Sequence, residues 1–293
     1  MITYFLAALL IARVVKSDGN TTIRGSCVSE VFEFDPARTY LTNDNGTDLV
    51  HYDWKLNSKD NSIVFDKGSA NLSIIKTSAD VQAQGTMIQT VRKFMYGQFT
   101  VRLKAASMPG VVTTIYALTE DNSEMDFYLT GGSNGTAQIN AFYNGSELLP
   151  QTNTILVPVD NGIGSTHDYT FDWQHQAMTW LIDNKKVYQF SAVGNQTTGG
   201  VLKTPITVKV AVWDGGSMPD RSIWAGGPIQ TLNQPISTKI SSLTVQCYDE
   251  HDIPVQKYPN DATNPSRSGG INVKAPIQII IAVIAFVSGL TVL

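Results

Sequence analysis

Charged side chains are scarce in this sequence, and no basic run occurs in it. Only 16% of the 293 residues are charged, and the formal net charge at pH 7 is −4. Nucleic-acid-binding domains present clustered Lys and Arg, often interleaved with aromatic residues. The sequence therefore argues against a nucleic acid as partner.

Metal-ligand spacings and cofactor motifs are also lacking. The four histidines show no ligand spacing with each other or with cysteine: His51, His167, His175 and His251. No phosphate loop, dinucleotide fingerprint or Ser-His-Asp elbow is found. We expect neither a metal nor a cofactor.

Cysteine is rare in this sequence, but the positions of the cysteines suggest a disulfide. The two cysteines are Cys27 and Cys247. In an oxidising compartment they could form one disulfide that ties the two ends of a domain together. Cys247 also fits a buried strand position, so a pair of free core thiols is the alternative.

The N-terminus predicts export. An apolar run over Ile2–Ala12 is followed by small residues at Val15 and Ser17. This layout predicts a signal peptide over residues 1–17, with a buried N-terminal helix as the alternative.

The C-terminus predicts a lipid anchor. Residues 249–270 are polar and rich in Pro, Asn and Ser, as in a flexible stalk, and residues 271–293 end in an apolar run. Small residues before that run predict a glycosylphosphatidylinositol (GPI) attachment signal, with Ser268 or Gly269 as acceptor. A tail-anchored transmembrane helix is the alternative, although stop-transfer charges are missing.

Six Asn-x-Ser/Thr sequons fit passage through the secretory pathway, and each predicts a surface position if it is used. They are Asn20, Asn45, Asn71, Asn134, Asn144 and Asn195.

Short alternating segments separated by turn signals fill the chain from about residue 28 onwards, and no convincing amphipathic helix occurs among them. The predicted strands cover residues 62–65, 72–76, 98–104, 111–118, 122–130, 137–143, 169–173, 178–182, 187–190, 206–213 and 243–247. Asn144-Gly145 and Asp183–Lys186 are the predicted hairpin turns. So many strands predict a sandwich or barrel, and favour two large curved sheets in one domain over residues 27–248.

The stretch Asn122–Gly132 is the candidate for chemistry. Its alternation directs Met125, Phe127 and Leu129 into a core, and Glu124, Asp126 and Tyr128 to the opposite face. Carboxylates that share one strand face are costly unless a site uses them. An ordinary solvated strand face is the alternative.

Two tryptophans are candidates for a sugar platform. Trp213 and Trp224 each precede a Gly-Gly pair, and Trp213 follows a strand whose outward face also holds Lys209. Aromatic rings surrounded by a few hydrogen-bonding groups bind the apolar faces of sugars well. The alternative is that both tryptophans are core residues.

Several motifs together resemble a known family. The run Tyr96–Ala106 resembles the "YG-x-x-x-x-R-x-K-A" strand of glycoside hydrolase family 16, and more closely that of fungal Crh-type cell-wall transglycosylases. Gly110–Thr114, Glu124-Met125-Asp126, Phe171-Asp172-Trp173, Trp180–Asp183 and the two Trp-x-Gly-Gly elements follow in the family's order. The resemblance covers roughly residues 50 to 245.

The resemblance implies a concanavalin A-like jelly-roll sandwich with a concave glycan cleft and retaining chemistry. It gives Glu124 the nucleophile position and Asp126 that of a helper. It implies substrate-binding roles for Lys209, Trp213, Ser222 and Trp224. The implied partners are chitin and β-glucan, and the membrane through the GPI anchor. We expect a monomer at the cell surface.

Tyr128 departs from the family pattern, because it occupies the position of the acid/base glutamate. A phenol with an ordinary pKa near 10 is a poor general acid at neutral pH. Glu120 or Asp121 in the preceding loop could supply another carboxyl. Three interpretations remain open: an active transglycosylase or hydrolase, a catalytically inactive polysaccharide-binding protein of the same fold, and a surface adhesin or spacer.

Overall fold

The computed structural model describes residues 27–41, 52–57, 62–74, 82–133, 135–147, 155–191, 202–230 and 235–256. The predicted signal peptide, the anchor signal with Ser268, and the sequons Asn20, Asn45, Asn134 and Asn195 lie outside these ranges. Chain contacts separate a unit over Met1–Asp261 from residues 262–293, and all described residues lie in the first unit. Within the described ranges, no helix is long and apolar enough to cross a membrane.

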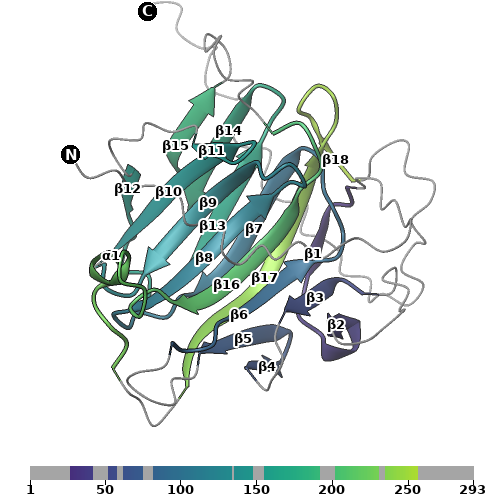
Figure 1. Ribbon diagram of the computed structural model, residues 1–293. Coiled ribbons are helices and arrows are strands. Elements are labelled where there is room, and N and C mark those ends of the chain that lie inside the picture. The colour runs from purple at the N-terminus through teal and green to yellow at the C-terminus, as the bar shows by residue number, and fades with distance from the viewer. Residues whose placement is uncertain are drawn as a thin grey trace, which may run out of the picture. The chain divides into compact units, whose positions relative to one another are not determined.

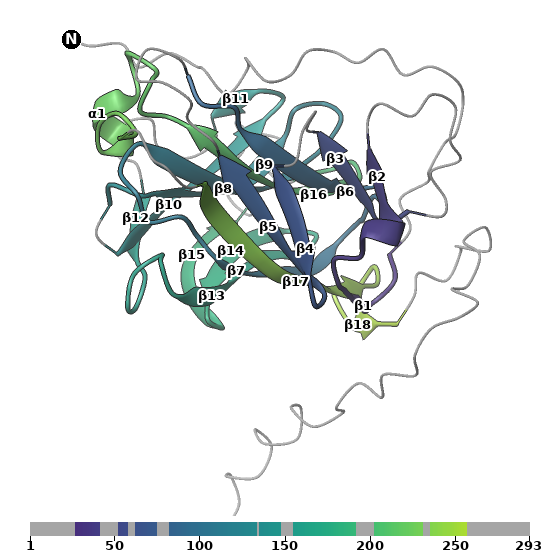
Figure 2. The ribbon, with the colours of Figure 1, turned by 90° about the horizontal axis from the view of Figure 1, so that it is seen from below.

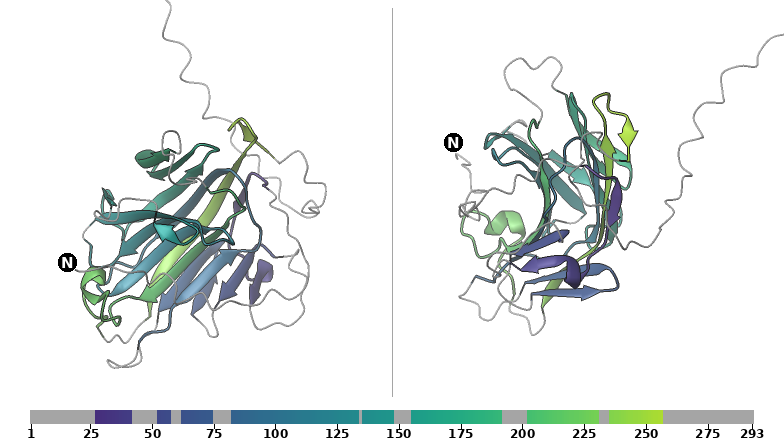
Figure 3. Two further views of the ribbon diagram at one scale, coloured as in Figure 1. Left: turned by 45° about the horizontal axis from the view of Figure 1, so that its top comes forward. Right: turned by 90° about the vertical axis from the view of Figure 1, so that its right-hand side faces the viewer.

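Two nine-stranded sheets form a β-sandwich, which confirms the predicted all-β class (Figures 1 and 3). The sheet that carries Glu124, here called the site sheet, has the strand order β11-β10-β9-β8-β16-β6-β3-β2, with β12 paired to β10. The other sheet, here called the supporting sheet, has the order β15-β14-β13-β7-β17-β5-β4, with β1 and β18 paired to β17. All pairings are antiparallel except that of β2 with β3.

The strands of the site sheet are β2 (Thr39–Leu41), β3 (Trp54–Asn57), β6 (Thr86–Thr90), β8 (Val111–Leu118), β9 (Glu124–Thr130), β10 (Thr136–Tyr143), β11 (Ser146–Glu147), β12 (Ile155–Pro158) and β16 (Thr207–Asp214). Those of the supporting sheet are β1 (Glu30–Phe32), β4 (Ile63–Asp66), β5 (Ser69–Ile74), β7 (Gly97–Lys104), β13 (Thr166–Trp173), β14 (Ala177–Ile182), β15 (Lys185–Ser191), β17 (Ile236–Tyr248) and β18 (Pro254–Val255). A single 3₁₀ turn, η2 (Pro36–Arg38), and a four-residue helix, α1 (Ser222–Ala225), complete the described elements.

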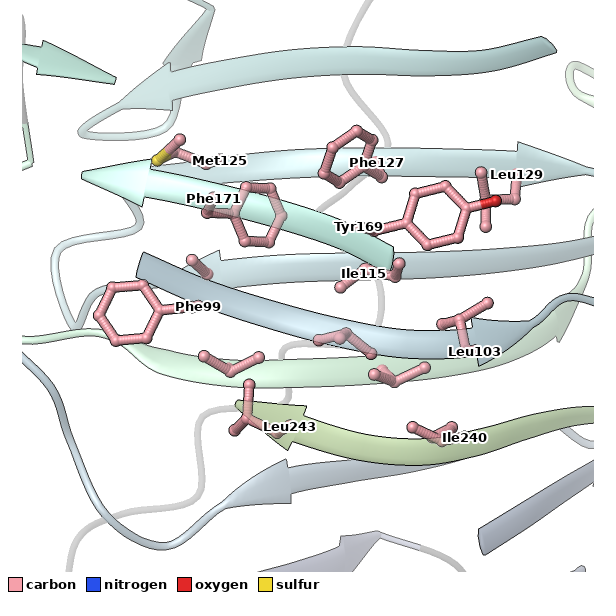
Figure 4. Close-up of a cluster of buried hydrophobic side chains, with 14 of the residues drawn as sticks. Phe99, Leu103, Ile115, Met125, Phe127, Leu129, Tyr169, Phe171, Ile240 and Leu243 are labelled. Carbon is pink, nitrogen blue, oxygen red and sulfur yellow. The ribbon is translucent and has the colours of Figure 1, made fainter. Parts of the chain in front are cut away.

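The core lies between the sheets, which are seen from below in Figure 2. Met125, Phe127 and Leu129 of β9 are 0% exposed, so the predicted inward phase of this strand is correct. The Phe127 ring packs against Tyr169 and Phe171 of β13, at centroid distances of 5.3 and 5.1 Å (Figure 4). Each large apolar side chain buried in this way stabilises the fold by roughly 1.5–3 kcal/mol. The core therefore fixes the direction in which the other face of β9 points.

Two predicted hairpins have tight two-residue turns. Asn144 and Gly145 join β10 to β11 with φ angles of 49° and 73°. Asp183 and Asn184 join β14 to β15 with φ angles of 49° and 63°, so this turn is shorter than the predicted four residues. Left-handed backbone at both central positions matches the twist of the flanking strands.

Cys27 and Cys247 form a disulfide, and both side chains are fully buried. The alternative of two free core thiols is therefore excluded. Cys247 lies on β17 directly opposite Gly97 of β7, so the bond ties the N-terminal end of the described chain to the centre of the supporting sheet.

Candidate active site

Glu124, Asp126 and Tyr128 lie on β9, between β8 and β10 of the site sheet. The strand register places Tyr116 and Asn140 on either side of Asp126. We call the outer face formed by Glu124, Asp126, Tyr128 and their cross-strand neighbours the carboxylate face. The predicted sharing of one face by these three side chains is correct.

The Asp126 carboxyl is buried and lacks a donor. The residue is 1% exposed, and no N–H or hydroxyl donor among the described residues reaches either carboxyl oxygen. Burial raises its pKa well above the ordinary value, and the nearby Glu124 charge raises it further. Asp126 therefore favours its protonated form more strongly than an ordinary aspartate does, and Glu124 is the neighbour with which it shares a hydrogen bond.

Glu124 is half-buried at the start of β9. Burial raises its pKa to about 7, against the opposing effects of the Asp126 hydrogen bond and the Lys209 charge. Glu124 thus changes from neutral acid to carboxylate near neutral pH. Above that pH it can act as a nucleophile, and the hydrogen bond with Asp126 stabilises its charge.

Lys209 lies on β16, opposite Tyr116, which in turn lies opposite Asp126. Its Nζ is 5.7 Å from the centroid of the Tyr116 ring. Burial lowers its pKa, the attraction of Glu124 opposes this shift, and the charge of Lys55 adds to it. Lys209 is therefore on the predicted face, within electrostatic reach of the nucleophile candidate.

Tyr128 lies between Thr114 and Gln138 of the two neighbouring strands. Its ring meets the Trp224 ring edge to face, with centroids 5.9 Å apart. Burial raises the pKa of its phenol well above the ordinary value, and the charges of Asp126 and Glu124 raise it further. The phenol is therefore an even weaker acid than free tyrosine.

Trp213 and Trp224 stack on each other, with centroids 6.0 Å apart and planes 27° from parallel. The indole Nε1 of Trp213 donates to Thr114 Oγ1 at 3.0 Å, and that of Trp224 donates to Gln138 Oε1 at 2.8 Å. Both rings are only half-buried, so they line the outer face and are not core residues. The Arg221 guanidinium lies 5.5 Å from the Trp213 ring centroid.

Ser222 begins helix α1, two residues before Trp224. Its backbone N–H donates to Met218 at 2.8 Å, and its carbonyl accepts from Gly227 at 2.7 Å. These bonds hold the turn that carries Trp224. A direct role of the Ser222 hydroxyl in binding stays a prediction.

The Gly131-Gly132 pair after β9 allows the α1 turn to approach the site sheet. A Cβ atom on Gly131 would lie 1.9 Å from the Met108 carbonyl oxygen. A Cβ atom on Gly132 would lie 2.4 Å from the Gly226 Cα, just beyond Trp224. Close backbone contact, which only glycine permits, therefore sets the position of the second tryptophan.

We expect Gly132→Ala to push the α1 turn away, and to destabilise the protein by roughly 1–3 kcal/mol. Urea unfolding measures the cost, and tryptophan fluorescence reports the displaced Trp224. Gly164→Ala is the control, because the atoms its Cβ would meet, at 3.1 and 3.2 Å, belong to the Ser107 side chain, which can turn aside. Equal, small effects of the two substitutions would contradict this account.

Neither of the two substitute carboxyls predicted from the loop is aimed at the site. Glu120 forms an exposed ion pair with Lys93. Asp121 accepts hydrogen bonds from the Thr119 hydroxyl and from the Ser123 N–H. Burial acts to raise the Asp121 pKa, but the hydrogen bonds from Thr119 and Ser123 lower it overall. The Glu120 carboxyl is thus paired with a lysine that follows β6, and the Asp121 carboxyl is bonded within the β8–β9 connection.

Reasoning from the sequence missed several side chains of the carboxylate face. Tyr116, Gln138 and Asn140 face outward on β8 and β10. Alternation within the two predicted strands could have identified them. Arg221 lies outside the strands, and no periodic pattern indicates it.

Two sequons lie in described ranges. Asn144 is exposed at the tip of the β10–β11 hairpin. Asn71 lies within β5, and its Nδ2 is 3.4 Å from the Val64 carbonyl oxygen. Occupancy of both sites stays a prediction.

A comparison of the sequence with known families identifies one match: the family described as Glycosyl hydrolases family 16 matches residues 50–231. Among curated proteins, Crh-like protein 2 of Aspergillus fumigatus is 28% identical over 178 residues, which cover 56% of this chain and 40% of that protein. The probable glycosidase CRR1 of Saccharomyces cerevisiae is 34% identical over 161 residues, which cover 52% of this chain and 37% of that protein. The chain thus spans less than half the length of either relative.

Solved structures show the same architecture. A Crh5 transglycosylase in complex with NAG is 26% identical, with a TM-score of 0.59, and the match covers 70% of this chain and 81% of that one. The Bacillus licheniformis β-glucanase has a TM-score of 0.58 at 17% identity, with 75% of this chain and 97% of that one covered. The second likeness supports the fold alone, which is the predicted jelly-roll sandwich.

Proposed function

The chain belongs to glycosyl hydrolase family 16, and on that premise we propose that it is a retaining glycosidase or transglycosylase that acts on cell-wall β-glycans. One observation carries the proposal. Glu124 and the buried Asp126 lie side by side on the carboxylate face, beside a stacked pair of tryptophans. Burying the Asp126 carboxyl without an N–H or hydroxyl donor costs stability, which is not expected on an ordinary solvated strand face.

In the proposed reaction, the Glu124 carboxylate attacks the anomeric carbon, and the bond to the leaving sugar breaks with proton transfer to its oxygen. Water or the hydroxyl of an acceptor sugar then releases the glycosyl group from Glu124. Asp126 holds the Glu124 carboxylate by a hydrogen bond in the free state. Tyr128 stands at the family's acid/base position with a raised pKa, so we expect slow turnover.

Chitin and β-glucan are the proposed substrates, as the resemblance to Crh-type enzymes implies, and a similar Crh5 transglycosylase is named as a complex with NAG, the sugar unit of chitin. Trp213 and Trp224 offer ring faces and edges for sugar C–H groups, and Lys209 lies near Glu124. We also propose that the protein is a monomer, secreted and held at the cell surface by a GPI anchor on Ser268.

Transfer between oligosaccharides tests the proposal. The secreted domain is incubated with a chitin or glucan donor and fluorescent glucan oligosaccharides as acceptors. We expect measurable transfer by the wild type and its loss in Glu124→Gln. Glu120→Gln, which alters an exposed ion pair, is the matched control. A folded wild type that neither transfers to these acceptors nor cleaves the donor would refute the activity.

The second candidate is a catalytically inactive polysaccharide-binding protein, favoured by Tyr128 at the acid position. It predicts binding to insoluble chitin or β-glucan that Trp213→Ala weakens and Glu124→Gln leaves unchanged, without transfer. An adhesin or spacer predicts no binding that depends on Trp213. A pull-down with the same variants separates these two.

A further inference from the structure

We propose that Glu147 on β11 supplies the proton that the family's glutamate would give, and so completes the acid/base chemistry in the presence of Tyr128. The inference rests on the proposed function. Three observations support it. The strand register places Glu147 on the carboxylate face, a hydrogen bond from Asn140 orients its carboxyl, and the carboxyls of Glu120 and Asp121 are bonded to other residues.

The register places Glu147 on the carboxylate face. Glu124 of β9 lies opposite Phe142 of β10, and Phe142 lies opposite Glu147 of β11. Directly opposed residues point to the same side of a sheet, so Glu147 shares the face with Glu124, about 9.6 Å away between Cα atoms across two strand spacings. Within the described part of the site sheet, Glu124, Asp126 and Glu147 are the carboxyls that the register puts on this face.

Asn140 draws the Glu147 carboxyl toward the centre of the site. Its Nδ2 donates to Glu147 Oε1 at 3.0 Å, while its Oδ1 accepts from the Ala141 N–H at 2.8 Å. The second bond fixes the amide orientation, so that its N–H groups face Glu147. Because Asn140 lies directly opposite Asp126, the Glu147 carboxyl is held toward the Asp126 row, which is the direction of Tyr128.

Glu147 is exposed, as a group that exchanges protons with solvent between turnovers requires. A glycan bound over the carboxylate face would cover it. By contrast, Glu120 is paired with Lys93, and the Asp121 carboxylate is held by Thr119 and Ser123.

The chemistry balances with Glu147 in both steps. In the first, the Glu147 carboxyl gives its proton to the glycosidic oxygen, the bond from that oxygen to the anomeric carbon breaks, and Glu124 forms the new bond to carbon. In the second, Glu147, now a carboxylate, takes the proton of the incoming water or sugar hydroxyl as that oxygen displaces Glu124. Both groups end in their starting states.

Leaving-group dependence distinguishes an acid from a structural residue. Wild type, Glu147→Gln and the control Glu120→Gln are assayed on an unactivated β-oligosaccharide and on the matching 2,4-dinitrophenyl β-glycoside, whose leaving group needs no proton. We expect Glu147→Gln to lower oligosaccharide turnover at least tenfold, and to change the initial dinitrophenolate release less than about twofold. Azide should accelerate turnover of the activated glycoside by Glu147→Gln and yield a β-glycosyl azide, because azide needs no general base.

Asn140 is a positioning residue in this scheme. Asn140→Ala should lower oligosaccharide turnover, with dinitrophenolate release from the activated glycoside unchanged. Loss of the Asn140 Nδ2 leaves the Glu147 carboxyl without the donor that orients it toward the centre of the site.

The outcomes separate the two proposals. Unchanged oligosaccharide turnover in Glu147→Gln, or equal losses on the two substrates, overturns the role of Glu147 while the glycosidase proposal stands. A folded wild type that releases neither dinitrophenolate nor sugar overturns both. Glu147 is supported as the acid/base if Glu147→Gln loses turnover of the oligosaccharide only, and if azide accelerates its turnover of the activated glycoside.

Discussion

Replacing Tyr128 with glutamate should raise turnover of an unactivated β-glycan by about 10²-fold, the lower end of what general acid–base assistance contributes. The alternation of β9 holds side chain 128 on the same face as Asp126 and Glu124, two residues along the strand from Asp126. A carboxyl there regains the family's acid/base position. The lower end of the range applies because Glu147 already supplies part of the proton transfer in the proposed scheme.

The surroundings of Tyr128 can accept a smaller polar group. Thr114 and Gln138 flank it across the two neighbouring strands. The substitution gives up the edge-to-face contact with Trp224, a loss of about 0.5–1.5 kcal/mol beyond the lost burial. We therefore expect Tyr128→Glu to fold with reduced stability, and its activity should be compared at equal folded fractions.

Two controls make the result specific. Tyr128→Phe should leave turnover unchanged, because a phenol whose pKa is raised by burial is not the proton donor. Tyr128→Gln should give no gain, because glutamine has nearly the shape of glutamate and lacks the acidic proton. When Tyr128→Glu is already in place, the further substitution Glu147→Gln should cost less than it does in the wild type. A folded Tyr128→Glu protein that still binds glycan and gains no activity would contradict this scheme.

Local sequence patterns correctly predicted features that depend on neighbouring residues, such as which side of a strand is buried and where a tight turn forms. The alternation of β9 is one-sided, because Met125, Phe127 and Leu129 pack in the core, so period-two reasoning placed Glu124 and Asp126 correctly. Asn144-Gly145 is a tight turn because both positions require left-handed backbone. The short strands β3 and β6 were not predicted, because four or five residues with mixed polarity are stabilised mainly by their neighbours in the sheet.

The positions of Glu147 and Arg221 depend on contacts between segments far apart in the sequence, which local patterns do not predict. Glu147 reaches the carboxylate face only because β11 pairs with β10 in one register, and Arg221 reaches Trp213 from outside the strands. The raised pKa of Asp126 likewise depends on burial by residues distant in sequence. Sequence spacing could therefore suggest Glu124 as the nucleophile, while the proposal of Glu147 as proton donor required the fold.

Stability should fall as the pH rises from 5 to 8, and Glu124 should account for much of the change. Burial raises its pKa from 4.5 to about 7 in the folded protein. Between those values the folded state binds more protons than the unfolded state, so the free energy of unfolding decreases with pH. The stability that neutral Glu124 contributes is complete below pH 4.5 and is lost as the pH rises through 7. The full loss is roughly 3 kcal/mol at 1.36 kcal/mol per pKa unit.

Other carboxyls do not reverse this sign. Burial also raises the pKa of Asp126, with a further increase from Glu124, and it raises that of Asp172. The lowered pKa values of Asp121 and Asp183 place their contributions on the acid side of 3.8, below the measured range. Urea unfolding at pH 5, 6, 7 and 8, at constant ionic strength, measures the slope. A flat wild-type profile would contradict the assignment.

Glu124→Gln should reduce this slope between pH 5 and 7, leaving the part that Asp126 and Asp172 contribute, and should make the protein more stable than the wild type at pH 8, because the amide needs no ionisation in its buried position. Glu120→Gln, at an exposed ion pair, should keep the wild-type slope. Glu124→Gln should at the same time abolish glycan transfer. A substitution that stabilises the fold and removes activity is expected where a carboxylate is kept for chemistry at a cost in stability. If Glu124 belonged to an ordinary solvated strand face, its replacement would change neither the pH slope nor the activity.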